Sequence, residues 1–274
     1  MNFSLIKGNA YELAPELAEE ISGRRVHIIT SPPYNKGIVY DGVREEKIPM
    51  HEWSRKIHSL FLTLGKNVEE SSSVWCQISD DLLDIFSYNL DYVTMVFAPL
   101  TPQALLFHFP RMDIECKILW LKSCTNPDGK SWGQFRPYTG KYPHNSFEWM
   151  LKLSKDGKFD QFNRTAEGLG VPPVDQKNVK RFSSCKNGLR CRGDVWAVPH
   201  IPRRNLKHPC PYPPELVRLG LLASDAKPGD LVIDPFCGIG SSGVAAKQLG
   251  VDFLGIDLSE NYLKIANDRI NETN

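Results

Sequence analysis

The sequence predicts an α/β fold in which helices cover both faces of a mostly parallel sheet. Short apolar segments rich in β-branched residues alternate along the chain with segments whose apolar residues recur at helical spacing. Such alternation is typical of parallel sheets, because a helix usually forms the crossover between parallel strands. With 274 residues, the chain is long enough for one large domain, with or without a small appendage.

The individual elements follow from these patterns. Strands are predicted at residues 3–6, 26–30, 74–78, 92–97, 117–121, 147–154, 231–234 and 253–256. Helices are predicted at residues 11–21, 53–68, 214–222, 242–249 and 259–270, the last of them capped by Ser259. Residues 155–206 contain glycines, prolines and basic residues with little periodicity, so we expect them to form an irregular, partly separate module.

Charge is distributed unevenly along the chain, although the formal net charge is only +1. From Lys152 to Lys207 there are 13 Lys and Arg residues but 5 Asp and Glu residues, a net charge of +8 that leaves −7 for the rest. A basic segment on an otherwise acidic protein is typical of a partner that carries phosphates. The alternative is a solvated loop that happens to be basic.

Composition argues against several classes of protein. There is no apolar run of about 18 residues and no basic leader before an apolar stretch, so we expect a soluble, cytoplasmic protein. The seven cysteines form no CxxC pair, which favours reduced thiols over a disulfide framework. Cys185 and Cys191 lack a second pair or histidine partners, and we expect no metal site.

The first functional motif begins where a predicted strand ends. Residues 26–30 run directly into Ser31, Pro32, Pro33 and Tyr34. Two prolines end a strand because each lacks a backbone donor and has a fixed φ, so they form a rigid elbow. Open α/β sheets place their ligand sites at the carboxyl ends of strands, which makes this elbow a candidate site. A Pro-Pro turn with Tyr34 packed in the core is the structural alternative.

The second motif, LVIDPFCGIGSSG at residues 231–243, is rich in glycine. Gly238, Gly240 and Gly243 spell GxGxxG, and Asp257 closes the next strand, a pattern that also fits a dinucleotide-binding unit. Asp234 precedes the first glycine, however, and a carboxylate there would repel a pyrophosphate. It would instead favour a cofactor that carries an amine and a sulfonium. A dinucleotide domain normally opens with such a unit, which here closes the sequence.

These motifs resemble those of the amino-group DNA methyltransferases. TSPPYN at residues 30–35 resembles the catalytic motif of that family, and residues 234–257 resemble its S-adenosylmethionine (SAM) motif. Their order, with the catalytic motif first, a target-recognition segment between and the cofactor motif last, is that of the β subgroup. Residues 8–13, 142–155 and 208–221 extend the resemblance. The sequence departs from the family at GIGSS, where GSGTT is frequent, and at Cys210, where alanine is frequent, but both changes keep small residues.

The resemblance implies a circularly permuted Rossmann-like SAM methyltransferase fold with a seven-stranded, mostly parallel sheet. Residues 1–154 would form the catalytic part of the core, 155–206 a DNA target-recognition segment, and 207–274 the SAM-binding part. The strand that starts at Phe3 would lie beside the strand that ends at Asp257, so the two termini should be near each other. The implied cofactor is SAM, and the implied partners are double-stranded DNA and a cognate restriction endonuclease. A monomer or a homodimer is expected.

The elbow supplies what methylation of an exocyclic amine requires. The hydroxyl of Ser31 and the carbonyl of Pro32, held still by Pro33, can accept the hydrogens of an amine whose lone pair is delocalised into the base. Tyr34 offers a flat face on which a flipped base can stack. By resemblance, serine at the first position favours cytosine N4 over adenine N6. Methylation of cytosine C5 would need a cysteine beside a proline, and Cys210, which follows one, lies far from the elbow in sequence.

The remaining candidate residues bind the cofactor or DNA. Asp257 is expected to accept the ribose hydroxyls, and Asp234 either to face SAM or to anchor the loop. Close contacts to SAM are also expected from Pro235, Phe236, Gly238 and Gly240. Asn9 and His208 complete the pocket by resemblance, and a structural hydrogen-bonding role is the alternative for His208. The basic residues expected to bind phosphates or to read guanine are Lys177, Lys180, Arg181, Lys186, Arg190, Arg192, Arg203 and Arg204. Three rival functions stay open: an inactive DNA-binding protein of the same fold, an RNA or protein-glutamine methyltransferase, and a dehydrogenase.

Overall fold

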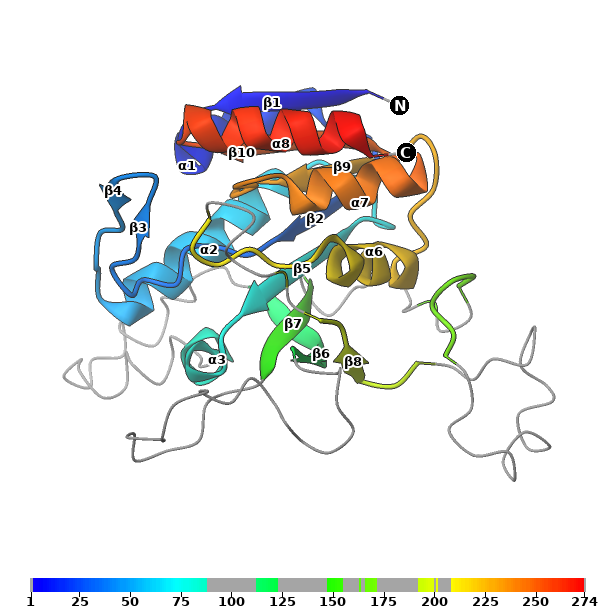
Figure 1. Ribbon diagram of the computed structural model, residues 1–274, viewed down its shortest axis with the longest axis horizontal. Helices are drawn as coiled ribbons and strands as arrows, with labels where there is room; N and C mark the ends of the chain where they lie inside the picture. Colours follow the sequence, from blue (N-terminus) through cyan, green and yellow to red (C-terminus); the bar gives the residue numbers. More distant parts are fainter. Residues whose placement is uncertain are drawn as a thin grey trace, which may run out of the picture.

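A single large sheet organises the computed structural model, which describes residues 2–87, 112–122, 147–154, 163, 166–171, 192–199, 201 and 208–273. In the described part the strand order is β1-β10-β9-β2-β5-β7-β6-β8 (Figure 1). The strands are β1 (Phe3–Lys7), β2 (Val26–Thr30), β5 (Ser73–Ile78), β6 (Asp113–Leu121), β7 (Phe147–Ser154), β8 (Val195–Ala197), β9 (Leu231–Asp234) and β10 (Asp252–Asp257).

The sheet is mostly parallel, as predicted. Five neighbouring strands are mutually parallel, namely β1, β10, β9, β2 and β5. β7 is antiparallel to both β5 and β6, and β8 is parallel to β6. The described residues contribute eight strands to this sheet, where seven were expected. The strand that the sequence did not indicate is β8, which lies within residues 155–206 and pairs Val195 with Leu119. The strand predicted at residues 92–97 lies outside the described residues.

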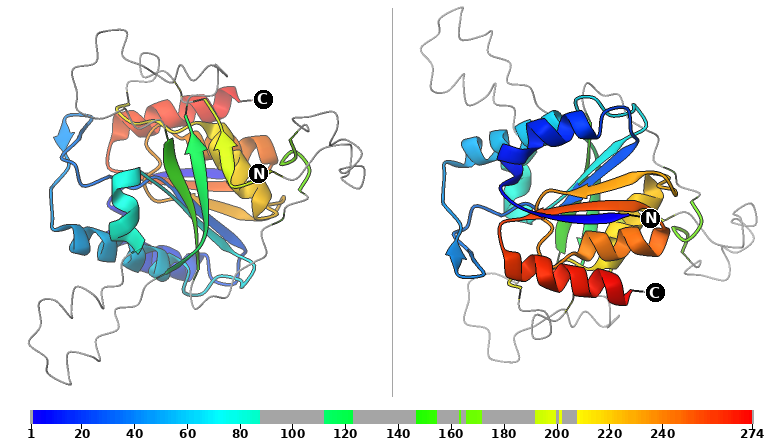
Figure 2. Two further views of the ribbon diagram at one scale, coloured as in Figure 1. Left: turned by 90° about the horizontal axis from the view of Figure 1, so that it is seen from below. Right: turned by 90° about the horizontal axis from the view of Figure 1, so that it is seen from above.

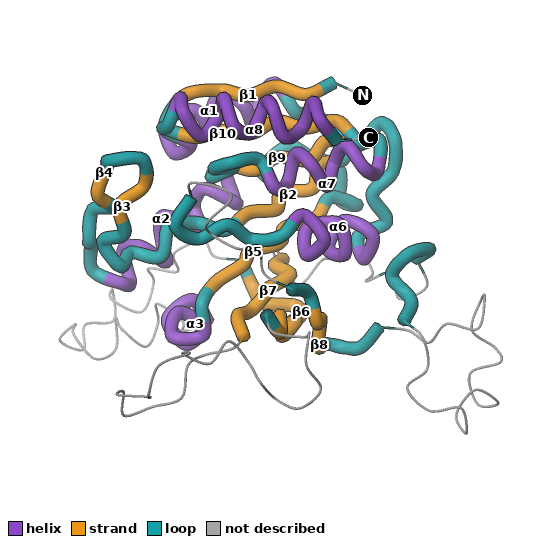
Figure 3. The backbone as a smooth tube through the Cα atoms, in the orientation of Figure 1, coloured by secondary structure: helices purple, strands orange, loops and turns teal. Residues whose placement is uncertain are grey.

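Helices cover both faces of the sheet, as Figures 2 and 3 show. α1 (Ala10–Glu20) and α2 (Met50–Leu64) lie on one face, α6 (Pro214–Ala223), α7 (Ser241–Leu249) and α8 (Glu260–Glu272) on the other, and α3 (Asp80–Ser87) follows β5. All five residues of β2 are buried, with Ile28 in the first core and Ile29 in the second. A strand covered on both sides needs no exposed polar face, and its two polar residues, His27 and Thr30, are buried and hydrogen-bonded.

The two ends of the chain meet in the sheet, which confirms the predicted circular arrangement. β1 pairs in parallel with β10, in a register that places Phe3 beside Phe253 and Lys7 beside Asp257. α8 begins where it was expected to begin, because the hydroxyl of Ser259 accepts a hydrogen bond of 3.1 Å from the backbone N–H of Tyr262. The last strand and helix therefore complete the sheet that the first strand starts.

A short hairpin follows the elbow and lies outside the main sheet. It consists of β3 (Val39–Tyr40) and β4 (Val43–Arg44), which pair in antiparallel fashion. Asp41 and Gly42, the two turn residues, have φ values of +47° and +82°. Positive φ at both central positions is the conformation that Asp-Gly favours in two-residue hairpins. The sequence thus determines a tight turn a few residues after the Pro-Pro elbow.

The described residues also bear on the expectations about membranes, thiols and metals. Among them, no helix is long and apolar enough to span a bilayer. Cys76 and Cys237 are buried thiols, and within the described part no three metal-ligating side chains gather around one point. Cys185 and Cys191 lie outside the described residues.

Candidate active site

The two sequence motifs lie at the same edge of the sheet, at the carboxyl ends of neighbouring strands. β2 and β9 are parallel neighbours in a register that pairs Ile28 with Ile233, so the residues that follow both strands meet. The hydroxyl of Thr30 donates a hydrogen bond of 2.5 Å to Oδ1 of Asp234. Because Ser31 directly follows Thr30, the first residue of the elbow lies next to the start of the glycine-rich loop.

Asp234 anchors the glycine-rich loop. Its side chain is fully buried and accepts four hydrogen bonds, from Thr30 Oγ1, from Tyr212 Oη at 2.8 Å, from the N–H of Phe236 at 3.1 Å and from Ser242 Oγ. Burial raises the pKa of Asp234, and the hydrogen bonds oppose that shift. Of the two roles expected for Asp234, the structure therefore favours the loop anchor over the cofactor-facing carboxylate.

The glycines of the loop are required by conformation and by close packing. Gly238 and Gly240 have φ values of +49° and +76°, which residues other than glycine rarely adopt. A Cβ at Gly240 would lie 2.7 Å from Cβ of Ala266 in α8, and one at Gly243 would lie 2.4 Å from Cδ1 of Ile270. The pattern that suggested ligand contact is thus also the pattern that lets α7 pack against α8.

Asp257 lies at the end of β10, beside this loop. Its Oδ2 accepts a hydrogen bond of 2.9 Å from the N–H of Gly238, and its Oδ1 accepts one of 2.8 Å from the N–H of Ser259. Burial raises the pKa of Asp257, the two backbone donors lower it, and the nearby carboxylate of Asp41 raises it. Each carboxylate oxygen keeps a further lone pair, which suits a ligand with two adjacent hydroxyls.

Two residues expected to complete the pocket have clear structural partners. The ring of His208 lies 5.8 Å from that of Tyr40 and 4.8 Å from that of Tyr262, measured between centroids. Burial, together with the nearby Arg269, lowers the pKa of His208 to about 4, so it is neutral at pH 7. Asn9 caps α1, because its Oδ1 accepts a hydrogen bond from the N–H of Tyr11.

The elbow presents one hydroxyl and one carbonyl. Ser31 Oγ donates a hydrogen bond of 2.7 Å to Oε1 of Gln77, which leaves its lone pairs available. The carbonyl of Pro33 accepts a hydrogen bond of 2.7 Å from the indole N–H of Trp53. No group in the described part of the chain donates to the carbonyl of Pro32. Two acceptors, Ser31 Oγ and the Pro32 carbonyl, are therefore available side by side in the sequence.

Tyr34 is packed rather than presented. Its residue exposure is only 8%, it belongs to the core beneath α2, and its hydroxyl donates to Oε1 of Gln77 at 2.7 Å. Nζ of Lys36 lies 5.5 Å from the ring centroid. In this conformation the ring of Tyr34 has little free face. The arrangement matches the structural alternative, a Pro-Pro turn with Tyr34 packed in the core. Stacking of a base on Tyr34 stays a prediction.

The loop after Tyr34 is held by one carboxylate of the hairpin. Oε2 of Glu45 accepts backbone N–H groups of Lys36, Gly37 and Ile38, at 3.0, 3.1 and 3.3 Å, while Oε1 accepts the N–H of Asn35. Successive N–H groups that converge in this way form a nest for an anion. Glu45 thus fixes the backbone directly behind the elbow.

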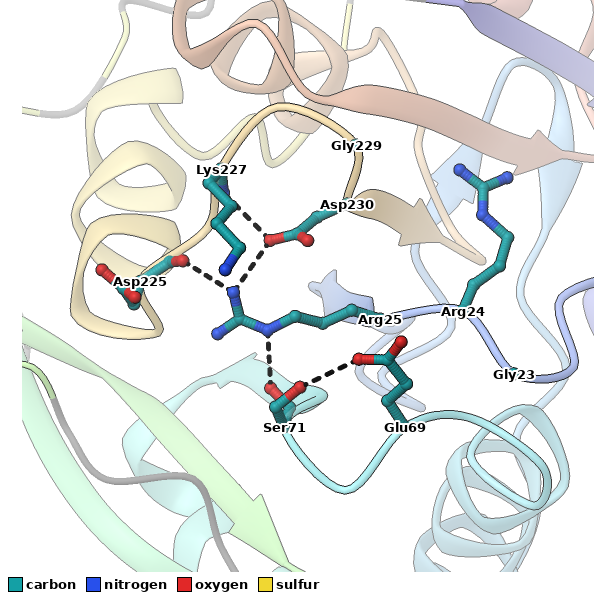
Figure 4. Close-up of a pocket in the computed structure, with 9 residues that line it drawn as sticks. All are labelled: Gly23, Arg24, Arg25, Glu69, Ser71, Asp225, Lys227, Gly229 and Asp230. Atoms are coloured by element: carbon teal, nitrogen blue, oxygen red, sulfur yellow. Dashed lines mark hydrogen bonds and ion pairs between the residues drawn. The ribbon is translucent and has the colours of Figure 1, made fainter.

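A polar pocket at the opposite edge of the sheet has a different character (Figure 4). Arg25 donates to the carbonyls of Ser71 and Asp225, at 3.1 and 2.9 Å, and to Oδ2 of Asp230 at 3.1 Å. The pocket lies where the strands begin, whereas open α/β sheets bind ligands where the strands end. Arg25 and Asp230 form an ion pair within it, so we regard this contact as a structural clamp.

Sequence reasoning missed several residues that surround the elbow. Gln77 and Trp53 lie outside every recognised motif. Glu148 and Tyr212 lie in stretches that resemble the family, but the resemblance assigned no role to either residue. Of the basic residues expected to bind DNA, only Arg192 is described, and its Nε donates to the carbonyl of Leu169 at 3.0 Å. The other seven lie outside the described residues.

Comparison with known proteins identifies the family. Residues 26–268 match the N6_N4_Mtase family model, whose description is DNA methylase. The chain belongs to this DNA methylase family. Among its relatives, the type II methyltransferase M2.DpnII of Streptococcus pneumoniae is 51% identical over 262 residues, covering 90% of this chain and 84% of that protein. M.SmaI of Serratia marcescens is 25% identical over 295 residues, covering 97% and 90%.

Solved structures support the fold of this methylase. The PvuII DNA methyltransferase, described as cytosine-N4-specific, superposes with a TM-score of 0.60 at 14% identity and covers 98% of this chain and 86% of its own. The M1.HpyAVI–SAM complex gives a TM-score of 0.57 at 16% identity and covers 98% and 99%. The predicted SAM methyltransferase fold is confirmed, SAM is the cofactor of this family, and the dehydrogenase alternative is wrong.

Proposed function

We propose that this methylase transfers the methyl group of SAM to the exocyclic amine of a base flipped out of double-stranded DNA. The observation that carries the proposal is the contact between Thr30 and Asp234, because it joins the catalytic elbow and the cofactor loop at one edge of the sheet. A methyl donor held by the loop and an amine held by the elbow would be direct neighbours. When bound, SAM supplies an electrophilic methyl group on a sulfonium.

The residues of the elbow account for activation of the amine. Its lone pair is delocalised into the aromatic ring, and two acceptors that hold both hydrogens favour the tetrahedral nitrogen that attacks a methyl group. Ser31 Oγ accepts because its own hydrogen is directed to Gln77, and the carbonyl of Pro32 is the second acceptor. The reaction needs no covalent intermediate with the protein.

Three observations support binding of SAM at the cofactor loop. Asp257 is half-buried and holds lone pairs for the ribose hydroxyls, while Gly238 and Gly240 bring backbone close to the edge of the sheet. Phe236 packs against Tyr11 at a centroid distance of 5.8 Å and supplies an aromatic wall. We assign ribose recognition to Asp257, with loop contacts from Pro235, Phe236, Gly238 and Gly240.

The base that receives the methyl group is the finer part of the proposal. We assign cytosine N4, because a neutral serine hydroxyl at the first position of the elbow is adequate for its exposed amine. Adenine N6 presents the same pair of hydrogens and is the alternative. The basic residues between Lys177 and Arg204 are assigned to DNA phosphates, and the type II names of the relatives support a role beside a cognate restriction endonuclease.

Nucleoside analysis tests this function. The protein is incubated with SAM and with duplex DNA that has been amplified from a bacterial genome. The amplified copy carries no methylated bases. The DNA is then digested to nucleosides, which are identified by mass. We expect N4-methylcytosine from the wild type and none from Ser31→Ala. N6-methyladenine would move the assignment to the alternative base. Absence of any methylated nucleoside would overturn the proposal and leave an inactive DNA-binding protein or a methyltransferase of RNA or protein.

A further inference from the structure

A chain of polar side chains extends behind the elbow, away from the cofactor loop. Oε1 of Gln77 accepts hydrogen bonds of 2.7 Å from both Ser31 Oγ and Tyr34 Oη. Nε2 of Gln77 donates a bond of 2.5 Å to Oε2 of Glu148, and Oε1 of Glu148 accepts from Nζ of Lys122. Gln77 is only 1% exposed, so these are its partners in place of water.

This chain has a defined polarity. A carboxylate can only accept hydrogen bonds, so Glu148 forces the amide of Gln77 to turn its N–H₂ group toward it. The oxygen of Gln77 then points to Ser31 and Tyr34, and the hydroxyl of Ser31 must donate to it. The hydroxyl of Tyr34 donates to the same oxygen at 2.7 Å and also lies 3.3 Å from Oε2 of Glu148. The hydrogen of Ser31 is thereby directed away from the reaction site. A hydroxyl that was free to rotate would place that hydrogen against the incoming amine in part of the population.

We propose that Glu148, charged and held by Lys122, is a positioning residue that sets the polarity of Gln77 and so keeps Ser31 an acceptor for the target amine. The inference rests on the proposed function and adds to it a residue from another strand. Glu148 lies on β7, Gln77 on β5, and Lys122 directly after β6. A side-chain amide is neither an effective acid nor an effective base near neutral pH, so the chain orients the hydroxyl and does not extract a proton through it.

An exchange of the two side chains separates this role from packing. In Glu148→Gln the acceptor-only group is lost, Gln77 can turn over, and its N–H₂ group would face Ser31. In the double variant Gln77→Glu with Glu148→Gln, the carboxylate accepts directly from Ser31 and Tyr34, and Gln at 148 donates to it. The atoms are nearly the same in number and shape, but only the second variant restores the polarity.

The test compares kcat for methyl transfer on amplified duplex DNA, with the SAM dissociation constant measured by calorimetry. We expect Glu148→Gln to lower kcat roughly tenfold or more with SAM affinity unchanged, since one hydrogen bond to the amine is lost. The double variant should recover most of the rate. Glu19→Gln is the matched control and should behave as wild type. Glu19 is an exposed carboxylate on α1 whose one hydrogen bond to the described residues is a 3.4 Å bond from Asn67.

The outcomes separate the inference from the proposed function. A wild type that methylates DNA, with Glu148→Gln as fast as wild type or a double variant no faster than Glu148→Gln, would overturn the inference alone. The hydrogen bond from Gln77 to Glu148, on which the polarity depends, also has a readout that needs no activity. The side-chain amide of Gln77, followed by NMR, should exchange with D₂O much more slowly than that of Gln248 in α7, which is not fully buried. Fast exchange at Gln77 would overturn the inference whether or not the wild type is active.

Discussion

The contact between Thr30 and Asp234 can be tested by a nearly isosteric change, Thr30→Val. Both side chains are fully buried, so the substitution keeps the packing and removes one hydrogen bond of 2.5 Å to a carboxylate. Hydrogen bonds to charged groups contribute about 1.5–3 kcal/mol to stability. For a chain of this size, that loss lowers the melting temperature by about 3–10 °C.

The measurement is urea unfolding followed by circular dichroism, where an unchanged m-value shows that only stability has changed. Thr63→Val is the control, because Thr63 Oγ1 donates to the carbonyl of Ser59 within α2 at 2.8 Å and its loss should cost within about 0.5 kcal/mol. A wild-type free energy of unfolding for Thr30→Val, or equal losses at both threonines, would refute the reasoning.

A double-mutant cycle localises the effect further. In Asp234→Asn the oxygen facing Thr30 is retained but carries no charge, and a neutral hydrogen bond contributes only about 0.5–1.5 kcal/mol. Thr30→Val should therefore cost less in the Asp234→Asn background than in the wild type. Equal costs in both backgrounds would mean that Thr30 acts through packing and that Asp234 is not its energetic partner.

Three further predictions concern the site. Ser31→Ala should cut methyl transfer while leaving SAM binding intact, and an equal loss in calorimetric affinity would contradict that division. Asp257→Ala should weaken SAM binding, and an unchanged dissociation constant would remove the ribose assignment. Because the pKa of His208 is about 4 when folded against an ordinary 6.5, its contribution to stability is present above pH 6.5 and is lost as the pH falls toward 4. His208→Phe keeps the ring contacts and should flatten the pH dependence of the free energy of unfolding between pH 4 and 6.5. The same pH dependence in the variant and the wild type would mean that His208 is not its source.

The sequence could predict the parts of the site that depend on local features. A strand rich in β-branched residues, a Pro-Pro pair and a run of glycines each have a local structural consequence, and together they placed Ser31 and Asp234 at the ends of strands. The capping of α8 by Ser259 follows from the same kind of local chemistry, and the structure contains it. The pairing of β1 with β10 came from the order of the motifs.

The parts that escaped prediction depend on pairing between distant strands. Gln77 reaches Glu148 only because β5 and β7 are antiparallel in a register that pairs Ile78 with Trp149, and nothing local encodes that register. Tyr34 was expected to present its ring, but its exposure is decided by α2 and by Gln77, neither of which is near it in sequence. The two possible roles of Asp234 were likewise separable only once Tyr212 and Ser242 were seen to bind it.

The hairpin of β3 and β4 connects the two motifs a second time, on the outside of the sheet. At its far end Glu45 holds the backbone N–H groups that follow the elbow, and at its tip Asp41 accepts from the hydroxyl of Ser259 and from Asn261 at the start of α8. Ser259, which caps α8, is two residues from Asp257, so the tip of the hairpin lies beside the proposed ribose site. Thr30 and Asp234 join the same two regions from within the core. The proposed acceptors of the elbow and the cofactor loop are therefore held in place by contacts on both sides, which is what the proposed direct methyl transfer requires.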